Sequence, residues 1–295
     1  MADRAKMTAP AVLARKGGPK LVMITAYDHP SALIASAAGV DIILVGDSLA
    51  NVVHGYDETL LVDLDIMVQH TAAVSRAEPK CLVVGDLPWM SYHISVEETV
   101  RNAGRLVREG GAEAVKLEGG RKRLPMIRAI LDAEIPVMGH IGLTPQSVHA
   151  MGGFKVQGRA VEQARELIDD ARALADAGIF ALVLEGVPDV LASIITKEIP
   201  VPTIGIGAGA GCDGQVLVWH DALGLSFGHA PKFVRQYADL GGIAIEALRS
   251  YAADVQAGEF PNDDESYHMS DEVSALLLGE PTRKLDLDPD WPMSW

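Results

Sequence analysis

Residues 41–47, DIILVGD, contain four consecutive aliphatic residues followed by Gly-Asp, and residues 81–86, CLVVGD, repeat the pattern. Three further apolar runs also end at ionisable side chains: AVKLE (114–118), IPVMGH (135–140) and ALVLE (181–185). A strand buried on both faces has a continuous apolar sequence, so each run is predicted to be a parallel strand with a polar group at its C-terminal end. Enzymes built on parallel barrels and sheets carry their chemistry at this end. We therefore expect six side chains to face one pocket: Asp47, Asp86, Lys116, Glu118, His140 and Glu185.

Predicted strands and helices alternate along the rest of the chain. The eight predicted strands are residues 21–26, 41–47, 81–87, 114–119, 135–143, 181–187, 202–209 and 215–225. The predicted helices are residues 30–39, 63–77, 97–111, 121–133, 161–177, 189–198 and 232–250. Eight strands favour an α/β protein with a (β/α)8 TIM barrel over a doubly wound sheet, which more often has five or six strands.

Three regions are predicted along the chain. An N-terminal lead segment (1–18) precedes the barrel domain (19–260), and an acidic tail follows it (261–295). Within the tail, residues 271–280, DEVSALLLGE, could form a short helix. The rest of the tail, with Trp291 and Trp295, is expected to be flexible or to pack on a neighbouring subunit.

Composition excludes several classes of protein. The formal net charge of −15 disfavours nucleic acid and anionic membranes as partners, because both attract basic surfaces. Every apolar run is too short to span a membrane, and residues 1–17 lack the apolar centre of a signal peptide. Cys81 and Cys212 are too few for a disulfide framework. A cytoplasmic protein is therefore expected.

Three of the acids at the strand ends suit a hard cation. Asp47 and Asp86 at one barrel mouth would offer carboxylate oxygens to Mg²⁺, which commonly takes one or two protein carboxylates together with substrate and water. Either aspartate alone is more simply explained as a cap of the following helix or turn. With Glu118 at a third strand end, metal binding becomes the favoured interpretation.

The other three side chains each have a catalytic and a structural interpretation. Lys116 lies two residues before Glu118 on the same strand face, so it could hold a substrate carboxylate, form a Schiff base or neutralise Glu118. Glu185, with apolar neighbours, is a candidate for proton transfer or a buried hydrogen-bond acceptor. His140 could orient a ligand or accept a proton, or it could lie behind the metal ligands and be hydrogen-bonded to them. In the run GGFKVQGR (152–159), Lys155 and Arg159 could meet an anionic cofactor, although a solvated loop is the default interpretation.

Several motifs together resemble the ketopantoate hydroxymethyltransferase family over roughly residues 20–260. They are TAYDHPSA (25–32), VGDSLANVVHGYDETL (45–60), HTAAV (70–74), GDLPWMSY (85–92), VKLEGG (115–120), GHIGLTPQSVHAMGGFKVQGR (139–159), LVLEGVP (182–188), IGIGAGAGCDGQVLVWHDALGL (204–225) and HAPKFV (229–234).

The resemblance implies a TIM barrel that uses Mg²⁺ and 5,10-methylenetetrahydrofolate to add a hydroxymethyl group to 3-methyl-2-oxobutanoate, through a metal-stabilised enolate. It also implies a homodecamer of paired pentamers. By motif, Asp47, Asp86 and Glu118 would lie at the metal, and Glu185 would be the catalytic base. Asp47, Ser48, Asp86 and Lys116 would contact the oxo acid.

Some positions depart from the family pattern. Glu58 and Asp63 stand where small or hydroxyl residues are usual, His54 stands where an apolar residue or Gln is common, and EGVP at 185–188 replaces ECVP. These changes could mark a different 2-oxo acid. One rival function is a metal-dependent lyase or aldolase of the phosphoenolpyruvate mutase and isocitrate lyase type, which would not need folate. The other is a noncatalytic ligand-binding barrel.

Overall fold

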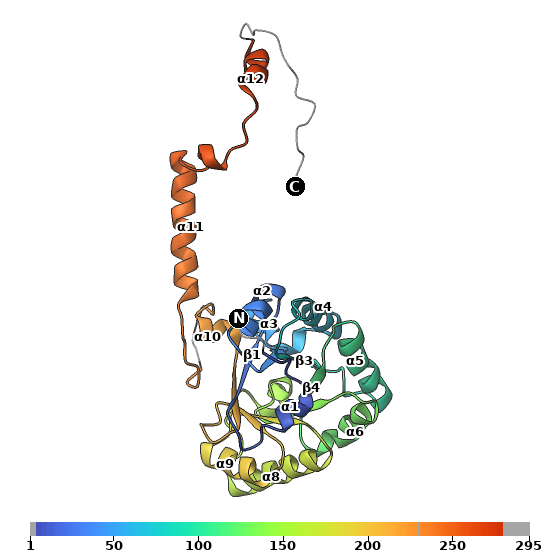
Figure 1. Ribbon diagram of the computed structural model, residues 1–295. Helices are drawn as coiled ribbons and strands as arrows, with labels where there is room; N and C mark the ends of the chain where they lie inside the picture. Colours follow the sequence, from blue (N-terminus) through green and yellow to red (C-terminus); the bar gives the residue numbers. More distant parts are fainter. Residues whose placement is uncertain (1–3, 229–230, 280–295) are drawn as a thin grey trace. The chain divides into compact units, whose positions relative to one another are not determined.

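The computed structural model describes residues 4–228 and 231–279, and its centre is a closed barrel of eight parallel strands. The strands pair in chain order, and β1 pairs with β8 to close the ring (Figure 1). Their bounds are β1 Leu21–Thr25, β2 Ile42–Val45, β3 Leu82–Asp86, β4 Ala114–Glu118, β5 Val137–Gly142, β6 Ala181–Glu185, β7 Thr203–Ile206 and β8 Gly214–Leu217. The predicted TIM barrel is confirmed.

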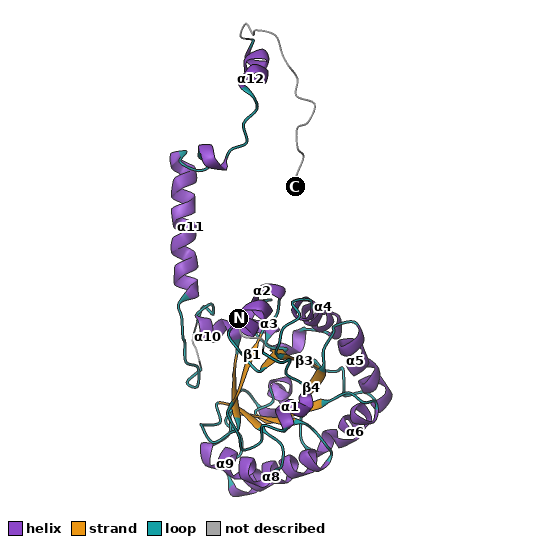
Figure 2. Cartoon of the chain, in the orientation of Figure 1, coloured by secondary structure: helices purple, strands orange, loops and turns teal. Residues whose placement is uncertain are grey.

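Helices surround the strands, as Figure 2 shows by colour. The larger barrel helices are α2 His29–Ala37, α4 Leu64–Ser75, α5 Val96–Arg108, α6 Leu124–Asp132, α8 Val161–Asp176 and α9 Asp189–Glu198. Shorter helices are α1 Ala9–Leu13, α3 Leu49–Val52, α7 Val148–Met151 and α10 Trp219–Leu223, and the 3-10 turns are η1 Thr59–Leu61, η2 Arg121–Arg123 and η3 Pro145–Ser147. All six larger helices overlap predicted ones.

Side-chain caps determine where several helices begin. Asp28 and Ser31 form a capping box at the start of α2, and Asp63 accepts a hydrogen bond from the backbone N of Ile66 at 3.0 Å to cap α4. Ser95 caps α5 in the same way, at 3.1 Å from the backbone N of Glu98. Such caps satisfy backbone N–H groups that have no partner within the helix, so polar residues at these turns direct the chain from each strand into the next helix.

Two apolar clusters hold the barrel together. The larger one lies between the sheet and the helices, and the smaller one fills the barrel interior with side chains such as Met23, Leu82 and Met138. Ala9 and Val12 of α1 belong to the interior cluster. The lead segment therefore contributes a short helix whose apolar face packs onto the interior cluster.

One predicted strand and one predicted helix have the wrong bounds. Only the first residues of the predicted strand 215–225 are extended, as part of β8. The following residues form α10, whose C-terminal cap is Gly224 with φ +70°. The predicted helix 232–250 begins only at 240, because the segment before it packs on α10. There the backbone N of Tyr237 donates to the carbonyl of Ala222 at 2.7 Å, and a Cβ on Gly224 would lie 2.4 Å from the carbonyl O of Ala238.

Contacts divide the chain into a unit of residues 1–239 and a unit of residues 240–295. The second unit contains α11 Leu240–Ala257, η4 Asp263–Glu265 and α12 Asp271–Leu278. Ser270 caps α12 and Gly279 ends it with φ +75°, so the short helix predicted in the tail is confirmed. Residues 280–295, including Trp291 and Trp295, lie outside the described residues. Among the described helices, none is both long and apolar enough to cross a bilayer.

Candidate active site

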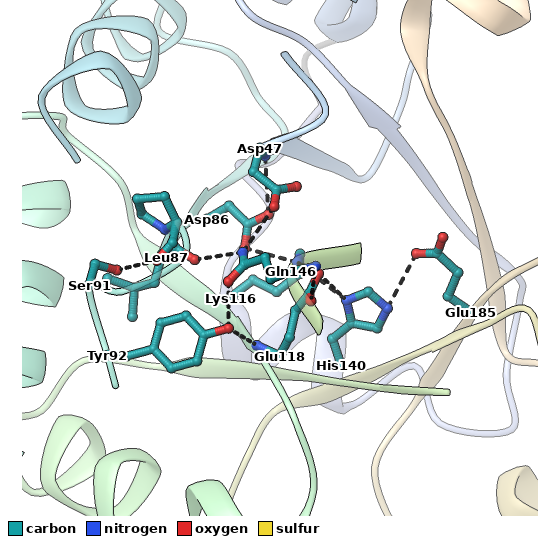
Figure 3. A network of polar contacts seen from close by, with 11 residues as sticks. Asp47, Asp86, Leu87, Ser91, Tyr92, Lys116, Glu118, His140, Gln146 and Glu185 are labelled. Atoms are coloured by element: carbon teal, nitrogen blue, oxygen red, sulfur yellow. Dashed lines mark hydrogen bonds and ion pairs between the residues drawn. The ribbon is translucent and has the colours of Figure 1, made fainter. Parts of the chain in front are cut away.

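The six ionisable side chains at the strand ends all line one cavity of about 540 Å³, as the sequence predicts. Strand register explains their proximity. Asp86 on β3 is paired with Lys116 on β4, and Glu118 on β4 is paired with His140 on β5. Ser48, which follows Asp47, also lines this cavity. Figure 3 shows the polar network that joins the six ionisable side chains.

Lys116 lies among carboxylates. Its Nζ is 2.8 Å from Oδ1 of Asp86 and 3.9 Å from Oε1 of Glu118, and all three side chains are buried. Burial alone would lower the pKa of Lys116, but the negative charges of Asp86, Glu118 and Asp47 outweigh it and raise that pKa. The amine therefore stays an ammonium ion, which suits charge neutralisation and disfavours a Schiff base.

Asp47 and Asp86 lie side by side and are hard to ionise together. The backbone N of Asp47 donates to Oδ2 of Asp86 at 3.3 Å. Burial, and then the negative charges of Asp86 and Glu118, raise the pKa of Asp47 to about 8. Burial also raises the pKa of Asp86, although Lys116 opposes this. A further positive charge at this position would stabilise both carboxylates.

His140 bridges two glutamates. Its Nδ1 lies 3.3 Å from Oε1 of Glu118, and its Nε2 lies 3.3 Å from Oε2 of Glu185 (Figure 3). Burial and Lys116 disfavour a charged imidazole, but the two carboxylates raise the pKa of His140 to about 9. Conversely, His140 contributes to lowering the pKa of Glu118 against the effect of burial. An imidazolium at this point would hold both glutamate side chains in place.

Three uncharged side chains that contact the site, Gln146, Tyr92 and Tyr27, were not predicted from the sequence. Gln146 donates from Nε2 to Oδ2 of Asp47 at 2.9 Å, and the hydroxyl of Tyr92 donates to Oε1 of Gln146 at 2.6 Å. The hydroxyl groups of Tyr27 and Ser48 are 2.9 Å apart. Gln146 lies within the motif of residues 139–159, but it is uncharged and does not end a strand, so the sequence alone does not distinguish it from the other polar residues there.

Two of the departures from the family pattern lie away from the charged network. Asp63 caps α4, and Glu58 pairs with His149, 3.1 Å between Oε2 and Nε2. Gly186 beside Glu185 has φ +54°, a left-handed conformation that glycine adopts without strain. These residues have structural explanations in this chain.

The acids at the mouth offer few direct ligands for a metal. Within residues 4–228 and 231–279, no three His, Cys, Asp or Glu side chains form a group that could hold a metal ion. Four carboxylates nevertheless face one ammonium and one imidazole: Asp47, Asp86, Glu118 and Glu185 against Lys116 and His140. This excess of negative oxygen donors fits a hard divalent cation held by one or two carboxylates.

Comparison with known proteins identifies the family. A model of ketopantoate hydroxymethyltransferase matches residues 6–263. This chain belongs to the ketopantoate hydroxymethyltransferase family. It is 56% identical over 259 residues to the 3-methyl-2-oxobutanoate hydroxymethyltransferase of Syntrophomonas wolfei, covering 88% of this chain and 94% of that relative. The corresponding protein of Moorella thermoacetica is 56% identical over 268 residues, covering 90% and 100%.

Solved structures of similar shape extend beyond this family. A crystal structure of 2,3-dimethylmalate lyase, a member of the PEP mutase/isocitrate lyase superfamily, superposes with a TM-score of 0.56. The alignment covers 94% of this chain and 93% of the lyase, at 18% sequence identity. At that identity the likeness concerns the fold alone.

Proposed function

We propose that this chain transfers a hydroxymethyl group from 5,10-methylenetetrahydrofolate to 3-methyl-2-oxobutanoate, forming 2-dehydropantoate in the first step of pantothenate biosynthesis. The observation that carries the proposal is the convergence of Asp47, Asp86, Lys116, Glu118 and Glu185 in one cavity of a family member. Identity of 56% to relatives named for this activity supports the choice of substrate.

Asp47 and Asp86 would hold the metal, with Glu118 close to it. The raised pKa values of Asp47 and Asp86 support this role, because a divalent cation compensates the negative charge that burial makes costly. Bound Mg²⁺ would supply Lewis-acid stabilisation of negative charge on the 2-oxo acid. With few protein ligands, the ion would complete its coordination with substrate and water.

The chain's own groups would bind and orient the oxo acid around that ion. Lys116, kept as an ammonium by its carboxylate neighbours, would attract negative charge on the substrate. Ser48 would offer its hydroxyl, whose position is supported by Tyr27 at 2.9 Å.

Glu185 is the proposed base. It would accept the C3 proton of 3-methyl-2-oxobutanoate, and the electron pair of the broken C–H bond would form the enolate. His140 lies 3.3 Å from the Glu185 carboxylate and would orient it. The enolate carbon would then bond to the methylene carbon of the folate, and the two bonds from that carbon to the folate nitrogens would break. Water would supply the hydroxyl group of the product. The two nitrogens would take up the proton released from C3 and the second proton of water.

The outer part of the cavity suits the folate. Phe154, Lys155 and Val156 on one loop and Lys232 and Phe233 on another line the same cavity as the acids. Phe154 and Phe233 are 61% and 41% exposed, so their rings are available to a flat pteridine or aminobenzoyl group. Lys155 and Lys232 would pair with the carboxylates of the glutamate portion of the folate. Arg159, considered with Lys155 from sequence, is not among the residues that line the cavity.

We also propose that the protein works in the cytoplasm as a decamer of paired pentamers, as the family resemblance implies. Exposed apolar side chains support assembly. In α11, Leu240, Leu248, Tyr251 and Val255 recur at helical spacing and are all at least 36% exposed. The lead (1–18), barrel (19–260) and tail (261–295) remain the proposed domain limits.

Two measurements test the proposed function. Product formation from labelled 3-methyl-2-oxobutanoate should require both a divalent metal and the reduced folate. Turnover of a 2-oxo acid without folate would favour a lyase, and binding without any turnover would favour a ligand-binding barrel. A structure determined with the oxo acid and Mg²⁺ should place the ion beside Asp47 and Asp86, and an ion elsewhere would contradict the proposed metal site.

A further inference from the structure

Gln146, which follows β5, is hydrogen-bonded to residues at the C-terminal ends of three other strands: β2, β3 and β4. Its backbone N donates to Oε2 of Glu118 at 3.0 Å. Its side-chain Nε2 donates to Oδ2 of Asp47 at 2.9 Å and to the carbonyl of Leu87 at 3.0 Å, and its Oε1 accepts from Tyr92 at 2.6 Å. Because Gln146 is 4% exposed, these bonds are shielded from water.

The neighbours of this amide permit one orientation only. The carboxylate of Asp47 and the carbonyl of Leu87 accept hydrogen bonds, so the NH₂ group must face them. The hydroxyl of Tyr92 already accepts from the backbone N of Glu118 at 3.3 Å, which leaves its proton for Oε1 of Gln146. Both donors of the amide and its oxygen are therefore used.

The contacts close a ring through one acid of the proposed metal site, Glu118, and attach a second, Asp47, to that ring. From Glu118, the ring passes through Tyr92 to the side chain of Gln146 and returns from the backbone of Gln146 to Glu118. The Asp47 carboxylate is attached to this ring through one oxygen, Oδ2. Because the backbone holds Cβ of Asp47, a hydrogen bond to Oδ2 restricts rotation about the Cβ–Cγ bond and therefore the direction of Oδ1.

We propose that Gln146 is a positioning residue that aims the Asp47 carboxylate at the divalent cation, and that Tyr92 fixes the orientation of the Gln146 amide. This inference rests on the proposed function, because Asp47 is a metal ligand only under that proposal. A neutral amide suits the position. A basic side chain would compete with the cation for Asp47, and an acidic one would add to the repulsion already present.

The test measures Mn²⁺ affinity of the full chain by calorimetry, which does not depend on turnover. Gln146→Met keeps the length of the side chain and removes its hydrogen bonds, so it should weaken Mn²⁺ binding by about ten- to hundredfold. Gln157→Met is the matched control, since Gln157 lies in the same stretch of chain and its amide donates to the carbonyl of Lys155. The Mn²⁺ affinity of Gln157→Met should stay at the wild-type value.

A double-mutant cycle separates positioning from simple support of the fold. Tyr92→Phe deletes one oxygen atom and should weaken Mn²⁺ binding several-fold in the wild-type background. It should have no further effect in Gln146→Met, because the amide that it orients is gone. Were Gln146→Met to unfold, Tyr92→Phe would carry the test, as the ring keeps its apolar packing.

The outcomes distinguish this inference from the proposed function. Wild-type protein that binds Mn²⁺ and transfers the hydroxymethyl group, beside a folded Gln146→Met that binds Mn²⁺ equally well, would overturn this inference alone. Additive effects of Tyr92→Phe and Gln146→Met would overturn the role of Tyr92. A wild-type protein without Mn²⁺ affinity would overturn the metal site and this inference together.

Discussion

The two ends of the barrel both bury aspartates, but they treat their charges in opposite ways. At the N-terminal end, Asp213 accepts from Lys16 and from the backbone N of Thr203, each at 2.9 Å, and from the backbone N of Gly17 at 3.1 Å. These donors lower the pKa of Asp213 although burial opposes them. At the C-terminal mouth, burial and neighbouring acids raise the pKa of Asp47.

Asp41 shows that the satisfied arrangement at the N-terminal end is general. Arg4 and Arg15 both pair with its carboxylate, and the backbone N of Val22 donates to it at 2.9 Å. The contrast with Asp47 teaches that burial alone does not decide the state of a carboxylate, because the donors around it do. Paired acids at the N-terminal end serve stability, whereas the mouth has more carboxyl groups than basic ones, and a bound cation would favour their ionised form.

The largest expected effect comes from removing a mouth carboxylate that the proposed chemistry uses. Glu185→Gln should lower kcat by about 10²- to 10⁴-fold, the range for loss of a general base, while the melting temperature stays close to wild type. Transfer rate and loss of deuterium from C3-labelled 3-methyl-2-oxobutanoate should fall together. Glu198→Gln is a suitable control, since Glu198 pairs with Arg172 at 2.7 Å and does not line the cavity. Unchanged deuterium loss in Glu185→Gln would remove Glu185 from the role of base.

A second prediction sets the two ends against each other in stability. Asp213→Asn should lower the free energy of unfolding by about 1–3 kcal/mol, because buried donors lose their acceptor. Asp47→Asn should raise it in metal-free protein at pH 8, because the repulsion with Asp86 and Glu118 is relieved. Urea unfolding in the presence of a chelator measures both. If both variants lost similar stability, the two ends would not differ in the way described.

The same comparison predicts how stability depends on pH. The folded protein holds the Asp47 proton up to about pH 8, whereas an unfolded aspartate releases it near pH 4, so rising pH within this window destabilises the fold. His140, with a pKa of about 9, acts in the same direction above about pH 6.5. Asp213 has a lowered pKa, so its contribution is present above about pH 4 and is lost as pH falls through the folded value.

Metal-free wild type should therefore lose stability from about pH 5 to pH 8. Asp47→Asn should flatten this decline, and Asp213→Asn should leave its slope unchanged. Thermal melts at both pH values measure the difference. An equally steep decline in Asp47→Asn would assign the pH dependence to other groups.

The strands were predictable from sequence because each is a short apolar run, and their polar ends identified the mouth. Once eight parallel strands close in chain order, residues as far apart as Asp47 and Glu185 must share one end of the barrel. The charged members of the site were therefore accessible without a structure. Their pKa shifts were not, because these depend on which donors and charges surround each group.

Two kinds of feature required the structure. The start of α11 depends on packing of the segment before residue 240 against α10 and Gly224, which no local pattern encodes. Gln146 is uncharged and lies after its strand, so it lacks the signal that identified Asp86 or His140. Its role follows from partners that are distant in sequence, Asp47 and Tyr92.

The smallest expected effect concerns the exposed aromatic residues of the cavity, Phe154 and Phe233. Here the comparison is between these exposed rings and the charged side chains at the strand ends. Phe154→Ala should raise the KM for the reduced folate by about two- to tenfold, because an aromatic contact contributes about 0.5–1.5 kcal/mol. The KM for 3-methyl-2-oxobutanoate should stay unchanged, since the oxo acid is proposed to bind among the acids. Phe227→Ala is the matched control, because Phe227 is 84% exposed and does not line the cavity. Equal changes in both KM values for Phe154→Ala would mean that Phe154 supports the oxo-acid site as much as the folate site, and would contradict a specific contact between Phe154 and the folate.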